Sequence, residues 1–154
     1  MIHLEIMTRE QCHELYRSWE NDPDIYTDMS LYKPYKYSEE SVNRYYDARQ
    51  EPTRILFAII SDGDVVGELQ LKKIDFETKE CTMSIHLQND GVKGRGYGTQ
   101  AELLALDYAF VILKMKAVNA DAVLKNERSQ NVLQKAGFRF VKEDDTFRYY
   151  RIER

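Results

Sequence analysis

The chain of 154 residues is poor in the residue types that hold metal ions and disulfides, with two cysteines and three histidines. Cys12 and Cys81 lie far apart and form no CxxC pair, and His3, His13 and His86 are scattered. Structural zinc sites need such residues at short, regular spacings. The sequence therefore predicts no metal, and both thiols are expected to be reduced.

Long apolar runs and a basic excess are also missing. The longest apolar strand-like run, Ile55 to Ile60, is far shorter than a bilayer-spanning helix. The N-terminal residues turn polar from Thr8 onward, so we expect no signal peptide and a cytoplasmic protein. A formal net charge of -4 argues against a nucleic-acid binder, which needs clustered Lys and Arg.

The composition that remains is that of one globular domain, with 43% hydrophobic and 31% charged residues. The length is sufficient for a hydrophobic core without metal or disulfide support. No repeat and no Pro- or Gly-rich linker divides the chain, so we expect a single domain over residues 1–154.

Capping patterns predict two helices in the first part of the chain. Thr8 precedes an apolar stripe and has Gln11 three residues later, which is the pattern of a capping box. Ser38 opens a second helix in the same way. Between them, Asp22-Pro23 predicts a further helical turn, and residues 30–37 are expected to be a loop.

A strand meander follows, with strands at 54–60, 64–73 and 79–88. Asp62-Gly63 is a hairpin signal between the first two. The third strand alternates, so that Met83, Ile85 and Leu87 share one face and His86 lies on the other. The remaining expected elements are a helix at 99–114, a strand at 117–124, a helix at 127–136 with Gly137 as its cap, and strands at 138–142 and 147–152. This order predicts a mixed α/β fold.

Glycines are concentrated in one loop between the third strand and the long helix. Four of the seven in the chain lie there, namely Gly91, Gly94, Gly96 and Gly98. Glycine allows positive φ and close approach of a ligand to the backbone. Backbone N–H groups at a helix N-terminus have no hydrogen-bond partner within the helix and can bind anions, and Lys93 and Arg95 add positive charge. The loop therefore predicts a pyrophosphate site.

Two common phosphate-binding motifs do not account for this loop. A Walker A motif fails because Tyr97, rather than Lys, follows Gly96. Residues 96–101 match the spacing GxGxxA of a Rossmann fold, but they follow an antiparallel meander late in a short chain. There is no room for two mononucleotide-binding halves, and we reject this interpretation.

Residues 93–99, KGRGYGT, closely resemble the acetyl-CoA loop of the Gcn5-related N-acetyltransferases, Q/R-x-x-G-x-G/A, with Lys93 in place of the usual Gln or Arg. Residues 126–129 and 135–138 resemble the second signature of that family, N-x-x-[SA] leading to K-x-G-F. Residues 19–23, WENDP, resemble the branch that includes ribosomal-protein N-terminal acetyltransferases of RimJ/RimL type. The resemblance spans essentially the whole chain.

This resemblance implies a mostly antiparallel mixed sheet of about seven strands flanked by about four helices. It also implies acetyl transfer from acetyl-CoA to a primary amine by direct attack in a ternary complex. In such enzymes the strand before the loop splays from the next one and pairs with the pantetheine arm. The residues implied to bind acetyl-CoA are Ile85, His86, Leu87, Gln88, Lys93, Gly94, Arg95, Gly96, Tyr97, Gly98, Thr99, Asn126 and Ser129. Asn126 has a helix N-cap as its simpler role, and both roles are compatible.

The resemblance also defines an unusual catalytic position. Many members of the family carry a tyrosine acid seven residues beyond the conserved Asn, where this chain has Leu133. Ser129 is the expected substitute, as a hydrogen-bond donor to the departing sulfur. For the base we expect His86 on the polar side of the strand, with Glu68 and Glu80 as rivals acting through a water.

The acceptor is less defined by the sequence. Tyr32, Tyr35 and Tyr37 are expected to line its cleft, although they serve equally well as a cover for the core. A lysine amine has a pKa near 10.4 and an α-amine one near 7.7–8.0, so a site without a strong base favours a peptide N-terminus over lysine. Small amines such as a polyamine or an aminoglycoside remain alternatives. The chain could instead be an acyl-CoA-sensing module without turnover, and a homodimer through an edge strand is allowed but not required.

Overall fold

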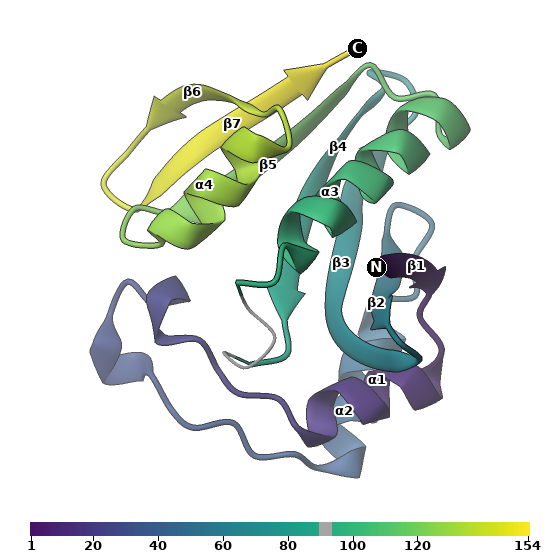
Figure 1. Cartoon of the computed structure of the whole chain (residues 1–154), viewed down its shortest axis with the longest axis vertical. Coiled ribbons are helices and arrows are strands. Elements are labelled where there is room, and N and C mark those ends of the chain that lie inside the picture. The colour runs from purple at the N-terminus through teal and green to yellow at the C-terminus, as the bar shows by residue number, and fades with distance from the viewer. Residues whose placement is uncertain (90–93) are drawn as a thin grey trace.

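A single seven-stranded sheet runs through the computed structural model, which describes residues 1–89 and 94–154. The strand order is β1-β2-β3-β4-β5-β7-β6 (Figure 1). The strands are β1 (Ile2–Ile6), β2 (Ile55–Ser61), β3 (Asp64–Asp75), β4 (Glu80–Leu87), β5 (Ala117–Val123), β6 (Arg139–Glu143) and β7 (Phe147–Glu153). All neighbouring pairs are antiparallel except β4 and β5. The expected mixed, mostly antiparallel fold is confirmed.

Helices cover both faces of this sheet. They are α1 (Arg9–Arg17), α2 (Glu39–Ala48), α3 (Tyr97–Asp107) and α4 (Glu127–Lys135), with short turns η1 (Pro23–Ile25) and η2 (Met29–Leu31) and a π-helical segment η4 (Tyr108–Ile112). The hydrophobic core has two parts. Side chains of β2 enter both, because Phe57 and Ile59 pack on the α3 side while Leu56 and Ala58 pack on the α1 and α2 side. Successive strand residues point to opposite faces, so a strand covered on both sides is apolar throughout.

Local sequence signals set the element boundaries. Thr8 and Gln11 form the expected capping box at the start of α1, and Ser38 caps α2 through the Ser41 amide. Asp62 and Gly63 both have positive φ, as a two-residue type I′ hairpin turn requires. These signals were sufficient to place the first two helices and the β2–β3 hairpin.

The end of α4 follows its sequence signal as well. Gly137 has a φ of 103°, and its N–H bonds to the Gln134 carbonyl while the Phe138 N–H bonds to that of Leu133. This pair of bonds is a Schellman motif, which needs a residue in the left-handed region. The expected glycine cap is confirmed, and it directs the chain into β6.

Three elements differ from expectation. The helix expected at 99–114 begins at Tyr97 and changes after Asp107 into η4, whose Leu113 N–H bonds to the Tyr108 carbonyl. β3 extends two residues beyond Lys73 across a register shift, and η2 interrupts the expected loop. Packing decides the first difference, because Ala109 and Phe110 are buried while the chain turns toward β5.

The one parallel pair in the sheet is short. β4 and β5 are in register only from Glu80 opposite Ala117 to Thr82 opposite Asn119. Beyond these pairs the two strands diverge, and α4 packs over β5 while α3 crosses toward β4 (Figure 1). The splay anticipated between the strand before the loop and its neighbour is therefore present. Across the described residues, no helix is long and apolar enough to cross a membrane.

Candidate active site

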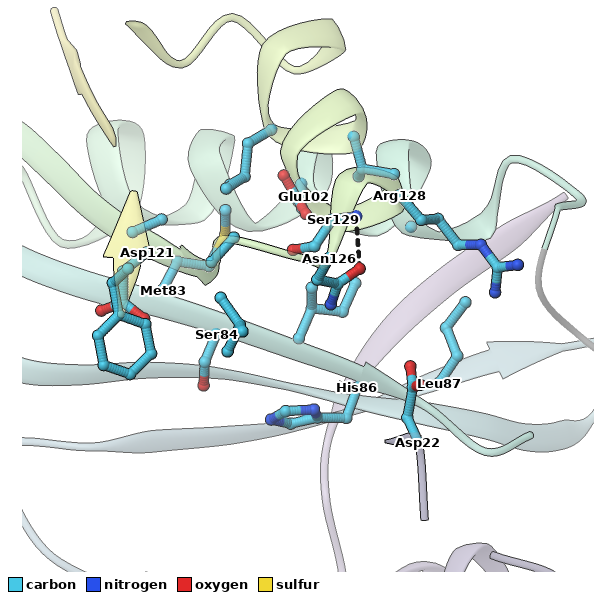
Figure 2. A pocket seen from close by; sticks show the side chains of 18 of the residues that line it. Asp22, Met83, Ser84, His86, Leu87, Glu102, Asp121, Asn126, Arg128 and Ser129 are labelled. Atoms are coloured by element: carbon cyan, nitrogen blue, oxygen red, sulfur yellow. Dashed lines mark hydrogen bonds between the residues drawn. The ribbon is translucent and has the colours of Figure 1, made fainter. Parts of the chain in front are cut away.

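A cavity of about 320 Å³ lies where β4 and β5 diverge. Its walls come from both strands, from the first turns of α3 and α4, and from the segment after α1. Figure 2 shows β4 crossing the cavity, with side chains that enter it from above and below the strand. Lining residues include Trp19, Asp22, Lys72, Met83, Ser84, Ile85, His86, Leu87, Gly98, Glu102, Asp121, Asn126, Arg128, Ser129 and Leu133.

The side of the cavity that faces α3 and α4 is mainly apolar. Met83 and Leu133 belong to the core cluster built around α3, and Ile85 and Leu87 pack against that cluster. Ala120 and Ala122 of β5 complete this wall with small side chains. A narrow, largely apolar space between two strand edges suits an extended chain molecule better than a compact polar one.

The opposite side of the cavity is polar. Ser84 and His86 alternate with the apolar residues of β4, so they point to the face that α1 and α2 cover. The His86 ring packs edge-on against Trp19, with 6.5 Å between ring centroids. Asp22 and Asp121 add carboxylates to this wall. The space between the strands therefore joins an apolar surface to a polar one.

The first turn of α3 reaches this space through Gly98. Gly96 is its N-cap residue with a φ of 78°, and no side chain of the described residues caps the helix. The first amides of α3 are therefore suited to an anion. Gly94 has the same φ, while Lys93 lies outside the described residues. The Tyr97 hydroxyl accepts a hydrogen bond from the Ser61 hydroxyl, and this contact joins the start of α3 to the β2–β3 hairpin. Hydrogen bonds with Ser61 and Arg95 lower the pKa of Tyr97.

The start of α4 forms another part of the wall. The Asn126 Oδ1 accepts a hydrogen bond from the Ser129 amide at 3.1 Å, so Asn126 is the N-cap, and its Nδ2 group remains a donor (Figure 2). Ser129 and Leu133 line the cavity one turn apart. The position where a tyrosine acid was expected by resemblance thus lies on the cavity wall, but it carries a buried leucine.

Glu102 is a cavity residue that the sequence reasoning missed. It lies on α3, has an exposed fraction of 0%, and neither of its carboxyl oxygens has a hydrogen-bond partner among the described residues. Burial raises its pKa to about 8. The available signal was an acidic residue in line with Ala101, Ala105 and Leu106 on the buried side of an apolar helix.

Comparisons with known proteins agree with this geometry. The family model of the acetyltransferase (GNAT) domain matches residues 2–139. The chain belongs to this family.

Individual relatives of this GNAT chain are distant. Spermidine N(1)-acetyltransferase of Escherichia coli strain K12 is 24% identical over 106 residues, which cover 69% of this chain and 56% of that protein. The chain thus spans little more than half the length of that relative. Acetyltransferase PseH of Campylobacter jejuni is 26% identical over 136 residues, covering 88% and 82% of the two chains.

The fold is shared with a solved structure. The crystal structure of spermidine N-acetyltransferase from Vibrio cholerae in complex with CoA and spermine superposes with a TM-score of 0.79 at 17% sequence identity. The superposition covers 99% of this chain and 95% of that one.

Several residues expected in the site of this GNAT chain lie outside the cavity. Glu68 is buried and accepts hydrogen bonds from Tyr16 and Tyr45 at 2.6 and 2.5 Å. It is nevertheless opposite His86 in the β3–β4 register, so both side chains point to the same face. Glu80 is held by Arg151 and Asn119 at the closed end of the strand pair. A base at Glu68 would therefore have to receive the proton of the amine through a neighbouring group, such as His86 opposite it on β4.

The three tyrosines expected in the acceptor cleft are used in packing. Tyr35 lies against Tyr16, and the Tyr37 hydroxyl bonds to His13. Tyr32 packs edge-on against Tyr26, and its hydroxyl bonds to the Asn21 carbonyl. None of the three is among the residues that line the cavity. They stabilise the segment between α1 and α2, which in turn places Trp19 and Asp22 at the cavity.

Gln88 also has a structural role instead of a place in the cavity wall. Its backbone carbonyl accepts from the Glu20 amide, its amide donates to Val66, and its side chain donates to Leu15. These contacts fasten the segment after α1 to the end of β4. Among the residues expected to bind the cofactor, those that line the cavity are Ile85, His86, Leu87, Gly98, Asn126 and Ser129.

Proposed function

We propose that this chain is an N-acetyltransferase that moves an acetyl group from acetyl-CoA to a primary amine in a ternary complex. The observation that carries the proposal is the cavity between β4 and β5, apolar toward α3 and α4 and polar toward α1 and α2. An acyl donor that enters from one side and an amine from the other meet between the strands. Direct transfer then needs no covalent enzyme intermediate.

The donor side provides two kinds of contact. The unpaired edge of β4 between Met83 and Leu87 offers main-chain groups to the amides of the pantetheine arm, as in strand addition. Gly94, Gly96 and the first turn of α3, Tyr97 to Thr99, offer amides to the pyrophosphate, with Arg95 nearby. Asn126 Nδ2 donates to a pantetheine carbonyl while Oδ1 caps α4.

The polar side provides the acceptor chemistry. His86 lies beside the space between the strands and accepts a proton from the attacking amine, with Glu68 next to it on β3. Asp22 and Asp121 favour a cationic acceptor through their charge. The acceptor is a peptide α-amine or a small amine; the spermidine acetyltransferases among the relatives favour the small amine, and the resemblance to the RimJ/RimL branch favours the peptide.

Two measurements test the proposal. Acetyl-CoA at about 100 times its Kd adds ~2.7 kcal/mol to the free energy of unfolding, which raises Tm by about 5–10 °C. Release of free thiol from acetyl-CoA is then measured with peptides and small amines. No Tm shift at millimolar acetyl-CoA, or no thiol release with any amine, contradicts the proposed activity.

A matched pair of glycine variants locates the donor site. Gly96 and Gly63 both have positive φ, and a Cβ added at either position meets no close neighbour, so valine strains the two backbones alike. Gly96→Val should remove the acetyl-CoA shift, because the added side chain occupies the phosphate approach. Gly63→Val, at the turn of the β2–β3 hairpin and not among the residues that line the cavity, should keep it. Equal shifts in both variants would place the cofactor elsewhere.

A second candidate function is an acyl-CoA sensor without turnover. The buried Leu133 at the position of the usual tyrosine acid favours it. Tight acetyl-CoA binding without thiol release across peptides and amines would support this alternative, and release with one amine would exclude it.

A further inference from the structure

Protonation of the leaving group is the step for which the proposed function lacks a strong donor. Ser129 is a weak acid, and Leu133 has no proton to give. In the proposed binding mode the acyl donor occupies the apolar side of the cavity, where a departing thiolate would be poorly solvated. An acid on that wall would solve this problem.

Glu102 lies on that wall. It projects from α3 into the cavity that Ser129 and Leu133 also line (Figure 2). Its exposed fraction is 0%, and both oxygens lack a hydrogen-bond partner within residues 1–89 and 94–154. A buried carboxyl without partners destabilises a fold, and the neighbouring buried positions of α3 hold alanine and leucine. Packing alone therefore gives no reason for a carboxyl group at this position.

The surroundings of Glu102 keep it protonated near neutral pH. Burial raises its pKa to about 8, and desolvation is the cause of this shift. A carboxylic acid in this state can donate a proton. The other charged or titratable side chains on the cavity wall are Lys72 of β3, His86 of β4, Asp121 of β5, Arg128 of α4 and Asp22 after α1.

We propose, resting on the proposed acetyl transfer, that Glu102 is the general acid that protonates the departing thiolate, directly or through the Ser129 hydroxyl. The amine nitrogen forms a bond to the thioester carbonyl carbon, and the carbon–sulfur bond breaks. Glu102 transfers its proton to the sulfur and becomes a carboxylate. The amine gives its extra proton to His86 and then to water, and Glu102 regains a proton from water after the thiol leaves.

Turnover provides the first test. Glu102→Gln keeps the shape but cannot donate an acidic proton, so kcat should fall about 100-fold while the Kd of acetyl-CoA changes less than about threefold. The wild-type kcat should decline as pH rises through about 8, and this decline should be absent in the variant. Asp107→Asn, on the exposed side of the same helix, should match the wild type.

A second test does not depend on turnover. The carboxyl carbon of Glu102 is followed by NMR in ¹³C-glutamate-labelled wild-type protein, with its signal assigned by its loss in Glu102→Gln. CoA should change the titration of this signal, whereas desulfo-CoA, which has the same chain without the sulfur, should leave it close to that of the free protein. The same change with both compounds would assign Glu102 to the pantetheine chain and overturn the proposal.

The outcomes distinguish the proposal on Glu102 from the proposed acetyl transfer on which it rests. Amine-dependent thiol release that is equally fast and has the same pH profile in Glu102→Gln overturns the acid and leaves acetyl transfer in place. Absence of thiol release from the wild type overturns both. A slow Glu102→Gln variant that still binds acetyl-CoA normally, together with the sulfur-dependent NMR response, establishes Glu102 as the acid.

Discussion

Two buried carboxyl groups lie on opposite faces of the sheet near the cavity, and their environments differ. Glu68 accepts hydrogen bonds from Tyr16 and Tyr45, and burial together with this carboxylate raises the pKa of both phenols. Glu102 has no such partners among the described residues, so burial acts on it without compensation. Hydrogen-bond donors stabilise an ionised carboxyl, and a dry apolar wall stabilises a neutral one. One face thus places a carboxyl group among hydrogen-bond donors, and the other places one against an apolar wall without donors among the described residues.

The free energy of unfolding should depend on pH through the ionisation of Glu102. Its folded-state pKa of about 8 is above the ordinary 4.5, so the folded state retains a proton that the unfolded state loses, and stability decreases as pH rises from about 4.5 to 8. Glu102→Gln removes this dependence. Between pH 5 and 8 the variant should gain about 2–4 kcal/mol relative to wild type, or ~5–10 °C in Tm. Thermal melts at both pH values check this; a constant difference in Tm would contradict it.

Ser129 should affect chemistry more than binding. Its hydroxyl lines the cavity, but its contribution to the α4 cap is made by the backbone amide, which alanine retains. Ser129→Ala should therefore lower kcat about tenfold with the Kd of acetyl-CoA within about twofold. Asn131→Ala, on the exposed side of α4, serves as the control in the same steady-state assay and calorimetry. A wild-type rate for Ser129→Ala would remove the serine from the mechanism.

At the level of elements, the role proposed for Asn126 would connect the stability of α4 to cofactor binding. Asn126 uses Oδ1 to cap the helix and has Nδ2 left to donate into the cavity. The two roles involve different atoms of the same amide, so a substitution can remove one and retain the other.

The pair Asn126→Asp and Asn126→Ala separates these roles. Aspartate keeps an acceptor for the Ser129 amide, so Tm should stay within about 2 °C of wild type, but the lost donor should weaken acetyl-CoA binding about tenfold. Alanine should lose the same affinity and about 1 kcal/mol of stability as well. Melting curves and titration calorimetry measure both effects. Unchanged affinity in the aspartate variant would assign Asn126 to capping alone.

The sequence was a good guide to the elements because their signals are local. Thr8, Ser38 and Gly137 each fix a helix end through one or two nearby hydrogen bonds. The π-helical turn at η4 was missed, since an i→i+5 hydrogen bond arises from packing and leaves no local sequence signal.

For the site, the glycine loop and residues 126–129 were recognisable as motifs, and residues 85–87 were recognisable by the alternation of faces along β4. Glu102 and Asp22 were not singled out, because only the tertiary fold brings α3 and the segment after α1 to the cavity.

On the scale of the whole molecule, the segment between α1 and α2 ties the N-terminal part of the chain to the open end of the cavity. Glu20 and Gln88 connect it to β4, and Lys125 contacts Met29 beyond β5. Trp19 lies within this segment and on the cavity wall against His86. The structure therefore places the single tryptophan of the chain at the site.

Tryptophan fluorescence should accordingly report on ligand binding. Saturating acetyl-CoA or an amine acceptor changes the surroundings of the Trp19 ring, so the emission intensity should change by about 10% or more. Titration with each ligand should give the same Kd as calorimetry. Trp19→Phe should bind acetyl-CoA without this signal, and an unchanged wild-type spectrum at saturation would place the ligand away from Trp19.

The short parallel pairing of β4 with β5 has a consequence for the sheet as a whole. Strands β1 to β4 form one block of the sheet and strands β5 to β7 form the other, and three residue pairs join the two blocks. Beyond these pairs, the edges of β4 and β5 that face each other have no strand partner. In the proposed binding mode, a cosubstrate with two amides in its arm would complete the hydrogen bonding there, so that each catalytic cycle would add a strand to the sheet and remove it again. Those amides of residues 83–87 that face away from β3 should exchange hydrogen rapidly in the free protein and slowly with acetyl-CoA bound. In this binding mode the arm of the cosubstrate serves as a temporary strand. When the cosubstrate leaves, the facing edges of β4 and β5 are again without a partner beyond their three residue pairs.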